Sequence, residues 1–311
     1  MTALICGSYA YDNIMVFHDH FKNHILPDKV HMLNVSFLVP EMRREFGGCA
    51  GNIAYNLNLL APGTALPMAT VGGDFLPYAE WMAECEISQQ QIKVVAESYT
   101  GQAFITTDLG DNQITAFHPG AMSFSHQNQV AAADDISIGI VSPDGRDGMI
   151  QHAEQFAEAG IPFIFDPGQG LPMFGCQELM RFIELADYAI FNDYEMQLMQ
   201  DRTGKTPHDL TAQLNALVVT RGSEGSLIYT QQHRIEIPAA NSTAVNDPTG
   251  CGDAYRGGLL YGLMNDLEWK TTGRIASLMG AICVADHGTQ NHTFKMGEFK
   301  KLFQDNFGYS L

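Results

Sequence analysis

The sequence predicts an α/β protein: a three-layer α/β/α sandwich around a central, mostly parallel sheet, with a small β-sheet lid. Two features predict it. Short apolar runs alternate with amphipathic segments along most of the chain, as expected for parallel strands joined by crossover helices. Residues 13–46 and 93–120 break this rhythm, because β-branched and aromatic residues alternate with polar ones there. We therefore expect a single domain over residues 1–311, with these two stretches forming the lid.

The expected elements of the body follow one another in strand–helix order. Each predicted strand is a short apolar run that ends in glycine, proline or a polar residue, and each predicted helix has apolar residues on one face. The strands are expected at 4–7, 68–71, 138–141, 163–165, 188–191 and 217–220, and the helices at 51–60, 148–159, 178–186, 193–201 and 255–264. Ligands of parallel sheets bind beyond the carboxyl ends of the strands, so the loops after these strands predict where a site lies.

In the second lid stretch, apolar and polar residues alternate at 102–107 and 113–117. The intervening Gly110-Asp111-Asn112 is a turn sequence, so we expect a β-hairpin. The aromatic residues of the lid are suited either to cover a bound ligand or to form the core of the lid. Its exposed strand edges can pair between subunits, so we expect a homodimer through the lid.

Composition narrows the class of protein. The chain has 17 Lys and Arg against 35 Asp and Glu, a net charge of −18, so its surface repels nucleic-acid phosphates and anionic membranes. No run approaches the roughly 18 uncharged apolar residues that span a bilayer, and the start, MTALICGSYAYD, lacks the basic residues of a signal peptide. The six cysteines have no C-x-x-C spacing, which indicates reduced thiols. We expect a cytoplasmic protein that binds neither nucleic acid nor membrane.

The strongest chemical signal is the segment 246–254, which reads NDPTGCGDA. It precedes the predicted helix 255–264, and backbone N–H groups at a helix N-terminus bind anions. An acid at Asp253 would repel a phosphate there. It is explained if Asp253 takes the proton of an attacking hydroxyl while the amides of residues 250–252 hold the transferred phosphoryl group. An Asp helix cap that follows loop glycines would have the same spacing.

Two other phosphate-binding motifs are incomplete. Gly204-Lys205-Thr206 ends like a Walker A loop, but position 199 is Met where the upstream glycine should stand. Position 255 is Tyr, so the segment after Gly250 lacks the third glycine of a dinucleotide-binding fingerprint. A P-loop enzyme and a nicotinamide oxidoreductase are therefore both disfavoured.

Four segments resemble, in order, motifs of the ribokinase (PfkB) family of sugar and nucleoside kinases. Residues 46–52 (FGGCAGN) resemble its G-G-x-x-x-N motif, residues 192–195 (NDYE) its N-x-x-E motif, residues 219–225 (VTRGSEG) the strand and loop beside the nucleotide, and residues 247–253 (DPTGCGD) its D-x-x-G-x-G-D signature. The resemblance covers most of the chain. It implies a ribokinase-like fold with a two-part lid, and an ATP-dependent phosphotransferase with an alcohol group as acceptor.

The resemblance also implies roles at the acceptor. Asp253 would deprotonate the acceptor hydroxyl, and the amides of Gly250, Cys251 and Gly252 would stabilise the transferring phosphoryl group. Asp12 would hydrogen bond sugar hydroxyls, although a solvated acid at a strand end is the other interpretation of this residue. The further candidates for substrate binding are Ser8, Gly47, Gly48, Asn52, Phe104 and Phe117.

On the nucleotide side, the resemblance assigns ATP binding to residues that follow two predicted strands. These are Asn192, Glu195, Thr220, Gly222 and Gly225. Asn192 and Glu195 would orient Mg²⁺ through water, or would form a helix cap with an exposed acid. Asp247 and the loop at Gly288 resemble a monovalent-cation site, for which K⁺ is the candidate ion.

The acceptor itself is harder to predict. The segments CGSYAYDNIMVF, REFGGCAGNIAYNL and DPTGCGDAYRGG most resemble bacterial adenosine kinases of this family, which implies transfer to the 5′-hydroxyl of adenosine to give AMP. A ribokinase- or fructokinase-like sugar kinase is the alternative, and a non-catalytic ligand sensor on the same fold is the alternative from another class. Arg256 departs from the apolar residue usual after the signature, and it could contact either a phosphate or an acid.

Overall fold

The body of the protein is built on a nine-stranded sheet in a computed structural model that describes residues 1–25, 32, 34–110 and 112–311. The strand order is β13-β12-β11-β10-β9-β8-β1-β4-β5; the pairs from β11 to β5 are parallel, and only β12 and β13 run antiparallel to their neighbours. The strands are β1 (Thr2–Cys6), β4 (Ala65–Gly72), β5 (Gln91–Val95), β8 (Ile136–Val141), β9 (Phe163–Phe165), β10 (Tyr188–Asn192), β11 (Ala216–Thr220), β12 (Ser226–Thr230) and β13 (Arg234–Ile237). The expected mostly parallel sheet is confirmed.

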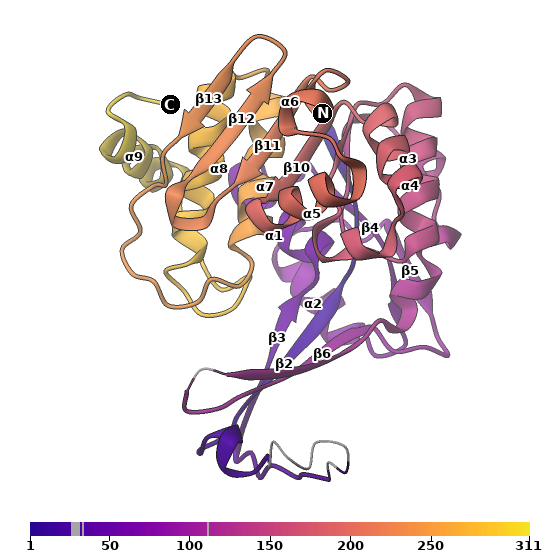
Figure 1. Ribbon diagram of the computed structural model, residues 1–311, viewed down its shortest axis with the longest axis vertical. Coiled ribbons are helices and arrows are strands. Elements are labelled where there is room, and N and C mark those ends of the chain that lie inside the picture. Colours follow the sequence, from indigo (N-terminus) through magenta and orange to yellow (C-terminus); the bar gives the residue numbers. More distant parts are fainter. Residues whose placement is uncertain (26–31, 33, 111) are drawn as a thin grey trace.

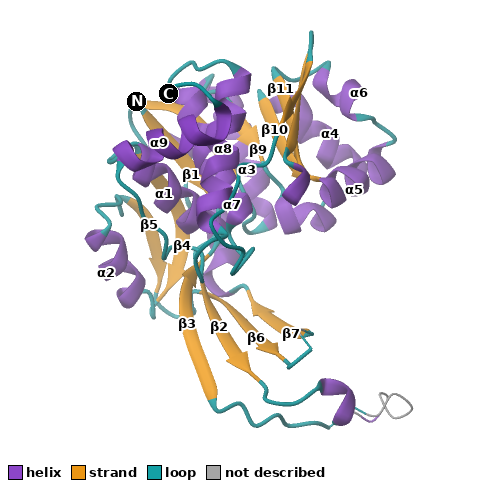
Figure 2. Ribbon diagram, turned by 90° about the vertical axis from the view of Figure 1, so that its left-hand side faces the viewer, coloured by secondary structure: helices purple, strands orange, loops and turns teal. Residues whose placement is uncertain are grey.

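Helices cover both faces of this sheet (Figures 1 and 2). Successive strand residues point to opposite faces. Ile5 therefore packs on the face covered by α1 and α7, while Leu4 packs on the face covered by α3, α4 and α5. The helices are α1 (Cys49–Leu60), α2 (Leu76–Glu84), α3 (Arg146–Ala159), α4 (Cys176–Leu185), α5 (Asp193–Thr203), α6 (Pro207–Thr211), α7 (Cys251–Met264), α8 (Trp269–Cys283) and α9 (Met296–Phe307). The three-layer prediction is confirmed. No helix in the part of the chain that the structure describes has the length and apolarity needed to cross a bilayer.

A separate four-stranded sheet projects from one end of the body and forms the lid (Figure 2). Its order is β3-β2-β6-β7, made of β2 (Ala10–Val16), β3 (Glu41–Gly47), β6 (Gly101–Thr107) and β7 (Gln113–His118). The antiparallel pairing of β6 with β7 confirms the predicted hairpin. Asp111 of its turn lies outside the described residues, as do residues 26–31 and 33 of the first lid stretch.

The lid strands β2 and β3 run from Ala10 to Gly47, slightly beyond the predicted stretch 13–46, and the larger difference is at the start of the second stretch. The second stretch was expected to begin at residue 93, but residues 93–95 belong to β5, which pairs in parallel with β4 at the edge of the large sheet. The local sequence indicates a strand at that point without specifying its partner. The helix expected at 255–264, α7, begins earlier, at Cys251, so Asp253 lies in its first turn.

Candidate active site

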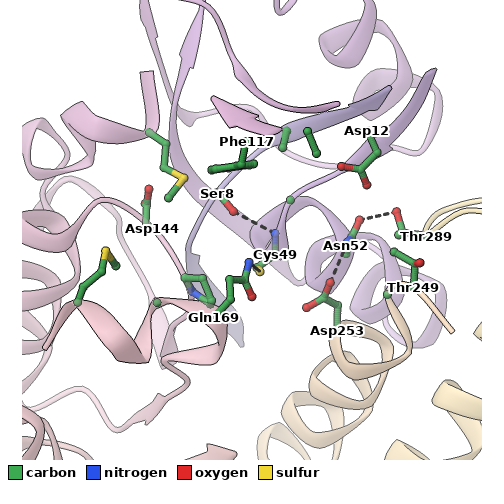
Figure 3. Close-up of a pocket in the computed structure, with 18 residues that line it drawn as sticks. Ser8, Asp12, Cys49, Asn52, Phe117, Asp144, Gln169, Thr249, Asp253 and Thr289 are labelled. Carbon is green, nitrogen blue, oxygen red and sulfur yellow. Dashed lines mark hydrogen bonds between the residues drawn. The ribbon is translucent and has the colours of Figure 1, made fainter. Parts of the chain in front are cut away.

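A cavity of about 600 Å³ lies where the lid meets the body. Asp12 and Phe117 reach it from the lid, while Asn52 and Asp253 reach it from α1 and α7 (Figure 3). Other lining residues follow the carboxyl ends of strands: Ser8 after β1, Asp144 after β8 and Gln169 after β9. The site therefore lies at the predicted edge of the parallel sheet.

The N-terminus of α7 forms one end of the cavity. Gly250 is the N-cap residue, and its carbonyl accepts the amide of Ala254 at 2.9 Å. The Cys251 amide donates to the Pro248 carbonyl at 3.3 Å, whereas the amides of Gly252 and Asp253 have no partner among the described residues. Unpaired first-turn amides favour a bound anion. The Gly252 and Asp253 amides are thus free to bind a phosphoryl group, whereas the Cys251 amide is already used. The sequence had predicted that the Cys251 amide would bind this group.

Asp253 sits between an amide and a guanidinium. Its Oδ2 accepts a hydrogen bond of 2.8 Å from Asn52 Nδ2. Burial raises the pKa of Asp253 to about 6, and the Arg256 guanidinium and the Asn52 amide oppose this rise. A carboxylate with a pKa near 6 is ionised at neutral pH yet is a stronger base than an ordinary aspartate, as proton abstraction requires.

Arg256 binds an acid rather than standing free for a phosphate. Its Nε and Nη2 donate to the two carboxylate oxygens of Asp166 at 2.6 and 2.5 Å, and its Nη1 donates to the Gly252 carbonyl at 3.0 Å. Ser142 Oγ also donates to Asp166, at 2.8 Å. Arg256 is 7% exposed and Asp166 1%. This buried ion pair ties the first turn of α7 to the loop after β9.

Asp12 projects from β2 beside the two glycines of the FGGCAGN segment. A side chain at Gly47 would place its Cβ 2.6 Å from Asp12 Oδ2, so glycine leaves room for this carboxylate. Gly48 has φ of +88°, and a Cβ there would lie 2.6 Å from the backbone of residues 8–10. Burial raises the pKa of Asp12 to about 6, and Glu45 and Asp247 add to the rise. Ser8 Oγ accepts the Cys49 amide at 3.2 Å at the start of α1.

Asp144 lies at the end of the cavity away from Asp253 (Figure 3). Phe117, Met122 and Met173 give the cavity its apolar lining. Phe104, which the sequence placed in the site, does not line the cavity. Its neighbours in register are Asn13 and Ala116, whereas Asp12, Ala103 and Phe117 form the next row. Adjacent rows face opposite sides of a sheet, so Phe104 lies on the outer face of the lid.

The predicted nucleotide-binding residues lie along the same edge of the sheet but do not line this cavity. Asn192 and Thr220 end β10 and β11 and are direct neighbours in register. Glu195 forms a capping box with Asn192: its Oε2 accepts the Asn192 amide at 2.8 Å, and its Oε1 accepts Asn192 Nδ2 at 2.9 Å. Gly222 and Gly225 flank the turn that joins β11 to β12.

Glu195 is the acid that the sequence assigns to magnesium. Within the residues that the structure describes, no three His, Cys, Asp or Glu side chains are grouped as a metal site. Both oxygens of Glu195 are already hydrogen bonded, so this residue would reach Mg²⁺ through water. Such indirect binding is common for this ion, which keeps several of its waters.

Asp247 and Gly288 do lie together, since Asp247 Oδ2 accepts the Gly288 amide at 3.1 Å. Asp247 Oδ1 also accepts the Thr249 amide, at 3.0 Å, and the Arg43 guanidinium lies 4.0 Å from Oδ2. The carboxylate therefore has partners of positive character already, and a K⁺ ion would compete with them.

Several functional candidates were missed from the sequence. Thr289 Oγ1 lies 2.8 Å from Asn52 Oδ1, and Gln290 Nε2 donates to the same oxygen at 2.9 Å. Asp144 and Gln169 line the cavity, and Asp166 pairs with Arg256. Asp144, Asp166 and Gln169 lie in loops that follow strands, so only the position of these loops signalled them. Thr289 and Gln290 lie in the loop between α8 and α9, next to Gly288, and belong to no recognisable motif.

The sequence matches the pfkB family of carbohydrate kinases over residues 11–295. The chain belongs to this family. It is 33% identical to a nucleoside kinase of Methanothermobacter thermautotrophicus, over 96% of this chain and 97% of that protein. It is similar to the structure of Burkholderia thailandensis nucleoside kinase in complex with inosine, with 51% identity, a TM-score of 0.91 and 99% of each chain covered.

A more distant relative shares the fold. Ribokinase from Thermotoga maritima has a TM-score of 0.81 at 20% identity, over 98% of this chain and 99% of that one. The pfkB kinase described here therefore has the ribokinase-like fold that its motifs imply. It is an ATP-dependent phosphotransferase of this family.

Proposed function

We propose that this pfkB kinase transfers the γ-phosphoryl group of ATP to the 5′-hydroxyl of a purine nucleoside. One observation carries the proposal: Asp253 stands beside unpaired amides at the N-terminus of α7, in the same cavity as Asp12 and Asn52. One bound molecule could then contact the base Asp253, the anion-binding amides of α7, and Asp12 and Asn52, which would bind its sugar hydroxyls.

In the proposed reaction, Asp253 accepts the proton of the 5′-hydroxyl as its oxygen attacks the γ-phosphorus. The bond between the γ-phosphorus and the bridging oxygen breaks, and ADP leaves. The Gly252 and Asp253 amides, with the dipole of α7, stabilise the charge on the transferring group. Mg²⁺, when bound with the nucleotide, would neutralise phosphate charge and would be oriented through water by Glu195. Thr220, Gly222 and Gly225 would contact the ATP phosphates.

The apolar lining of the cavity supports a nucleoside rather than a plain sugar. Phe117 offers a ring and Met122 and Met173 offer soft apolar surface, which suit a planar base. The similarity to a nucleoside kinase bound to inosine supports the same class of acceptor. The motifs favour adenosine as the acceptor, and inosine is the main alternative acceptor.

The test is a screen of ATP consumption with adenosine, inosine, ribose, fructose and fructose 6-phosphate, with the product identified by chromatography. We expect the highest rate with adenosine and a nucleoside 5′-monophosphate as product. Asp253→Asn should lower kcat by at least about 100-fold, the lower range for losing a general base. Turnover on sugars alone would overturn the nucleoside assignment. Binding of adenosine without ATP consumption would overturn the kinase and favour a sensor.

A further inference from the structure

A chain of hydrogen bonds runs from the half-buried indole of Trp81 to the proposed base. Trp81 Nε1 donates to Gln290 Oε1 at 2.9 Å, and Gln290 Nε2 donates to Asn52 Oδ1 at 2.9 Å. Asn52 Nδ2 then donates to Asp253 Oδ2 at 2.8 Å (Figure 3). Gln290 is 3% exposed and, like Trp81, does not line the cavity. Neither residue borders the cavity, so we expect their influence on a bound molecule to pass through Asn52.

The direction of this chain is fixed at its far end. An indole N–H can only donate, so the Gln290 oxygen must face Trp81 and the Gln290 amide nitrogen must face Asn52. The Asn52 oxygen then has to face Gln290, which leaves the Asn52 amide nitrogen toward Asp253. Exchanging oxygen and nitrogen in either amide would bring two donors or two acceptors together, which is costly in a buried site.

A second bond from Gln290 supports the same region. Its Nε2 also donates to Tyr78 Oη at 2.6 Å, and Tyr78 Oη donates to the Gly47 carbonyl at 2.9 Å. Gly47 packs against the Asp12 carboxylate. Gln290 is thus linked by hydrogen bonds through Asn52 to the proposed base Asp253, and through Tyr78 to Gly47, which packs against Asp12.

We propose that Gln290, oriented by Trp81, is a positioning residue that holds Asn52 with its amide N–H on Asp253 and so keeps the base ionised and aimed. This inference rests on the proposed role of Asp253. A turned Asn52 would present its carbonyl to Asp253, which would then hold its proton and donate it to that carbonyl. The hydrogen bond from Asn52 already opposes the rise that burial causes in the pKa of Asp253.

Other charged or titratable groups also influence Asp253, and the test must leave them in place. They are Arg256 on α7, Asp166 after β9, Asp12 on β2, Cys49 on α1, Cys251 at the start of α7 and Cys283 at the end of α8.

The experiment exchanges Gln290 for an isosteric acceptor. In Gln290→Glu, the new carboxylate can accept from Trp81 but can no longer donate to Asn52, so it draws the Asn52 amide N–H away from Asp253. The Thr289 hydroxyl lies 2.8 Å from the Asn52 oxygen and 2.6 Å from the Phe46 carbonyl, so it can donate to Phe46 when Asn52 turns. We expect the Asp253 titration, followed by carboxylate ¹³C NMR in the nucleotide-free protein, to move up by about one pH unit. The acidic limb of kcat/KM should move with it, and kcat at pH 7 should fall by about tenfold.

The negative charge introduced by Gln290→Glu would itself raise the pKa of Asp253, so this effect has to be separated from the effect of turning the Asn52 amide. In an Asn52→Leu background the hydrogen-bond chain is already broken, so Gln290→Glu should shift Asp253 there by less than half as much. Equal shifts in the two backgrounds would overturn the inference, because they would reflect charge alone. Trp81→Phe, which is neutral and keeps the ring, should lower kcat about threefold and raise the Asp253 titration slightly.

These outcomes are independent of the acceptor. An unchanged Asp253 titration in both folded variants, Gln290→Glu and Trp81→Phe, would refute the positioning role even if nucleosides are phosphorylated. If no acceptor is phosphorylated, the proposed function fails, while the NMR titration still decides whether Gln290 orients Asn52. Thermal midpoints identify the folded variants, and Trp81→Phe carries the test if Gln290→Glu does not fold.

Discussion

The two ends of the cavity are organised differently. At the end with Asp253, the described side chains hold one another in place: Asn52 donates to Asp253, Gln290 donates to Asn52, and Arg256 binds Asp166. At the other end, Asp144 Oδ2 is buried with no hydrogen-bond partner in the described part of the chain, and Phe117 is 52% exposed. The end proposed for the chemistry is therefore already held in place by hydrogen bonds, whereas the end proposed for recognition has an unpaired carboxylate oxygen and an exposed ring. This difference is expected where catalysis needs fixed geometry.

The largest effect should come from breaking the ordered end. Arg256→Leu leaves the Asp166 carboxylate buried without its bidentate partner, so we expect a loss of about 3–5 kcal/mol in the free energy of unfolding, measured in urea. Replacing both residues with apolar ones, as in Arg256→Leu with Asp166→Leu, should restore most of that loss. If the single variant is as stable as the wild type, the ion pair does not hold α7 to the loop after β9.

At the open end, the largest effect should follow from removing the aromatic ring. Phe117→Ala should raise KM for adenosine about tenfold with little change in kcat, the range expected for losing a stacking partner of a base. Phe104→Ala is the matched control, because this ring is similarly exposed but lies on the outer face of the lid. Equal KM values for the two variants would show that the lid face is not a determinant of nucleoside binding.

Asp144 should reveal the cost of its buried carboxylate as a pH effect on stability. Burial raises the pKa of Asp144 to about 8, while the unfolded chain has an ordinary value near 4. The native state therefore binds more protons between those values, and stability falls as pH rises through that window. Asp144→Asn removes this loss, which linkage puts at up to about 5 kcal/mol for a gap of about four pKa units. We expect the variant to exceed the wild type by at least about 1 kcal/mol in unfolding free energy at pH 9, since the amide does not match every contact of the protonated acid. Equal stabilities at pH 9 would contradict the raised pKa. The exposed Asp147→Asn is the control.

At the end of the cavity with Asp253, the sequence predicts the site residues better than it predicts the hydrogen-bond partners that hold them in place. Asp253, Asn52 and Gly48 lie in compact motifs, so they could be named from local spacing. The partner of Arg256 is 90 residues away and that of Asn52 is 238 away, and no local pattern links such pairs. Phe104 shows a different limit. Phe104 pairs with Ala116 in the hairpin, so its ring lies on the opposite face of the sheet from the ring of Phe117. Only one of the two rings could therefore face the cavity. The sequence does not tell which face of the lid sheet is turned toward the body.

The smallest expected effect is the change in kcat/KM near neutral pH, which comes from the titration of Asp253 and Asp12. The pKa values of Asp253 and Asp12 are both raised to about 6, and both residues act as ionised carboxylates in the proposed reaction. Activity is therefore kept above that pH and lost as pH falls through it. We expect kcat/KM for adenosine to fall by only about twofold between pH 7.5 and 6.5, and then with a log–log slope approaching two below about pH 6, because two groups must lose activity together. Asp12→Asn should reduce that slope to one. A wild-type slope of one, or an acidic limb below about pH 5, would mean that these two carboxylates do not titrate as a pair in the free enzyme.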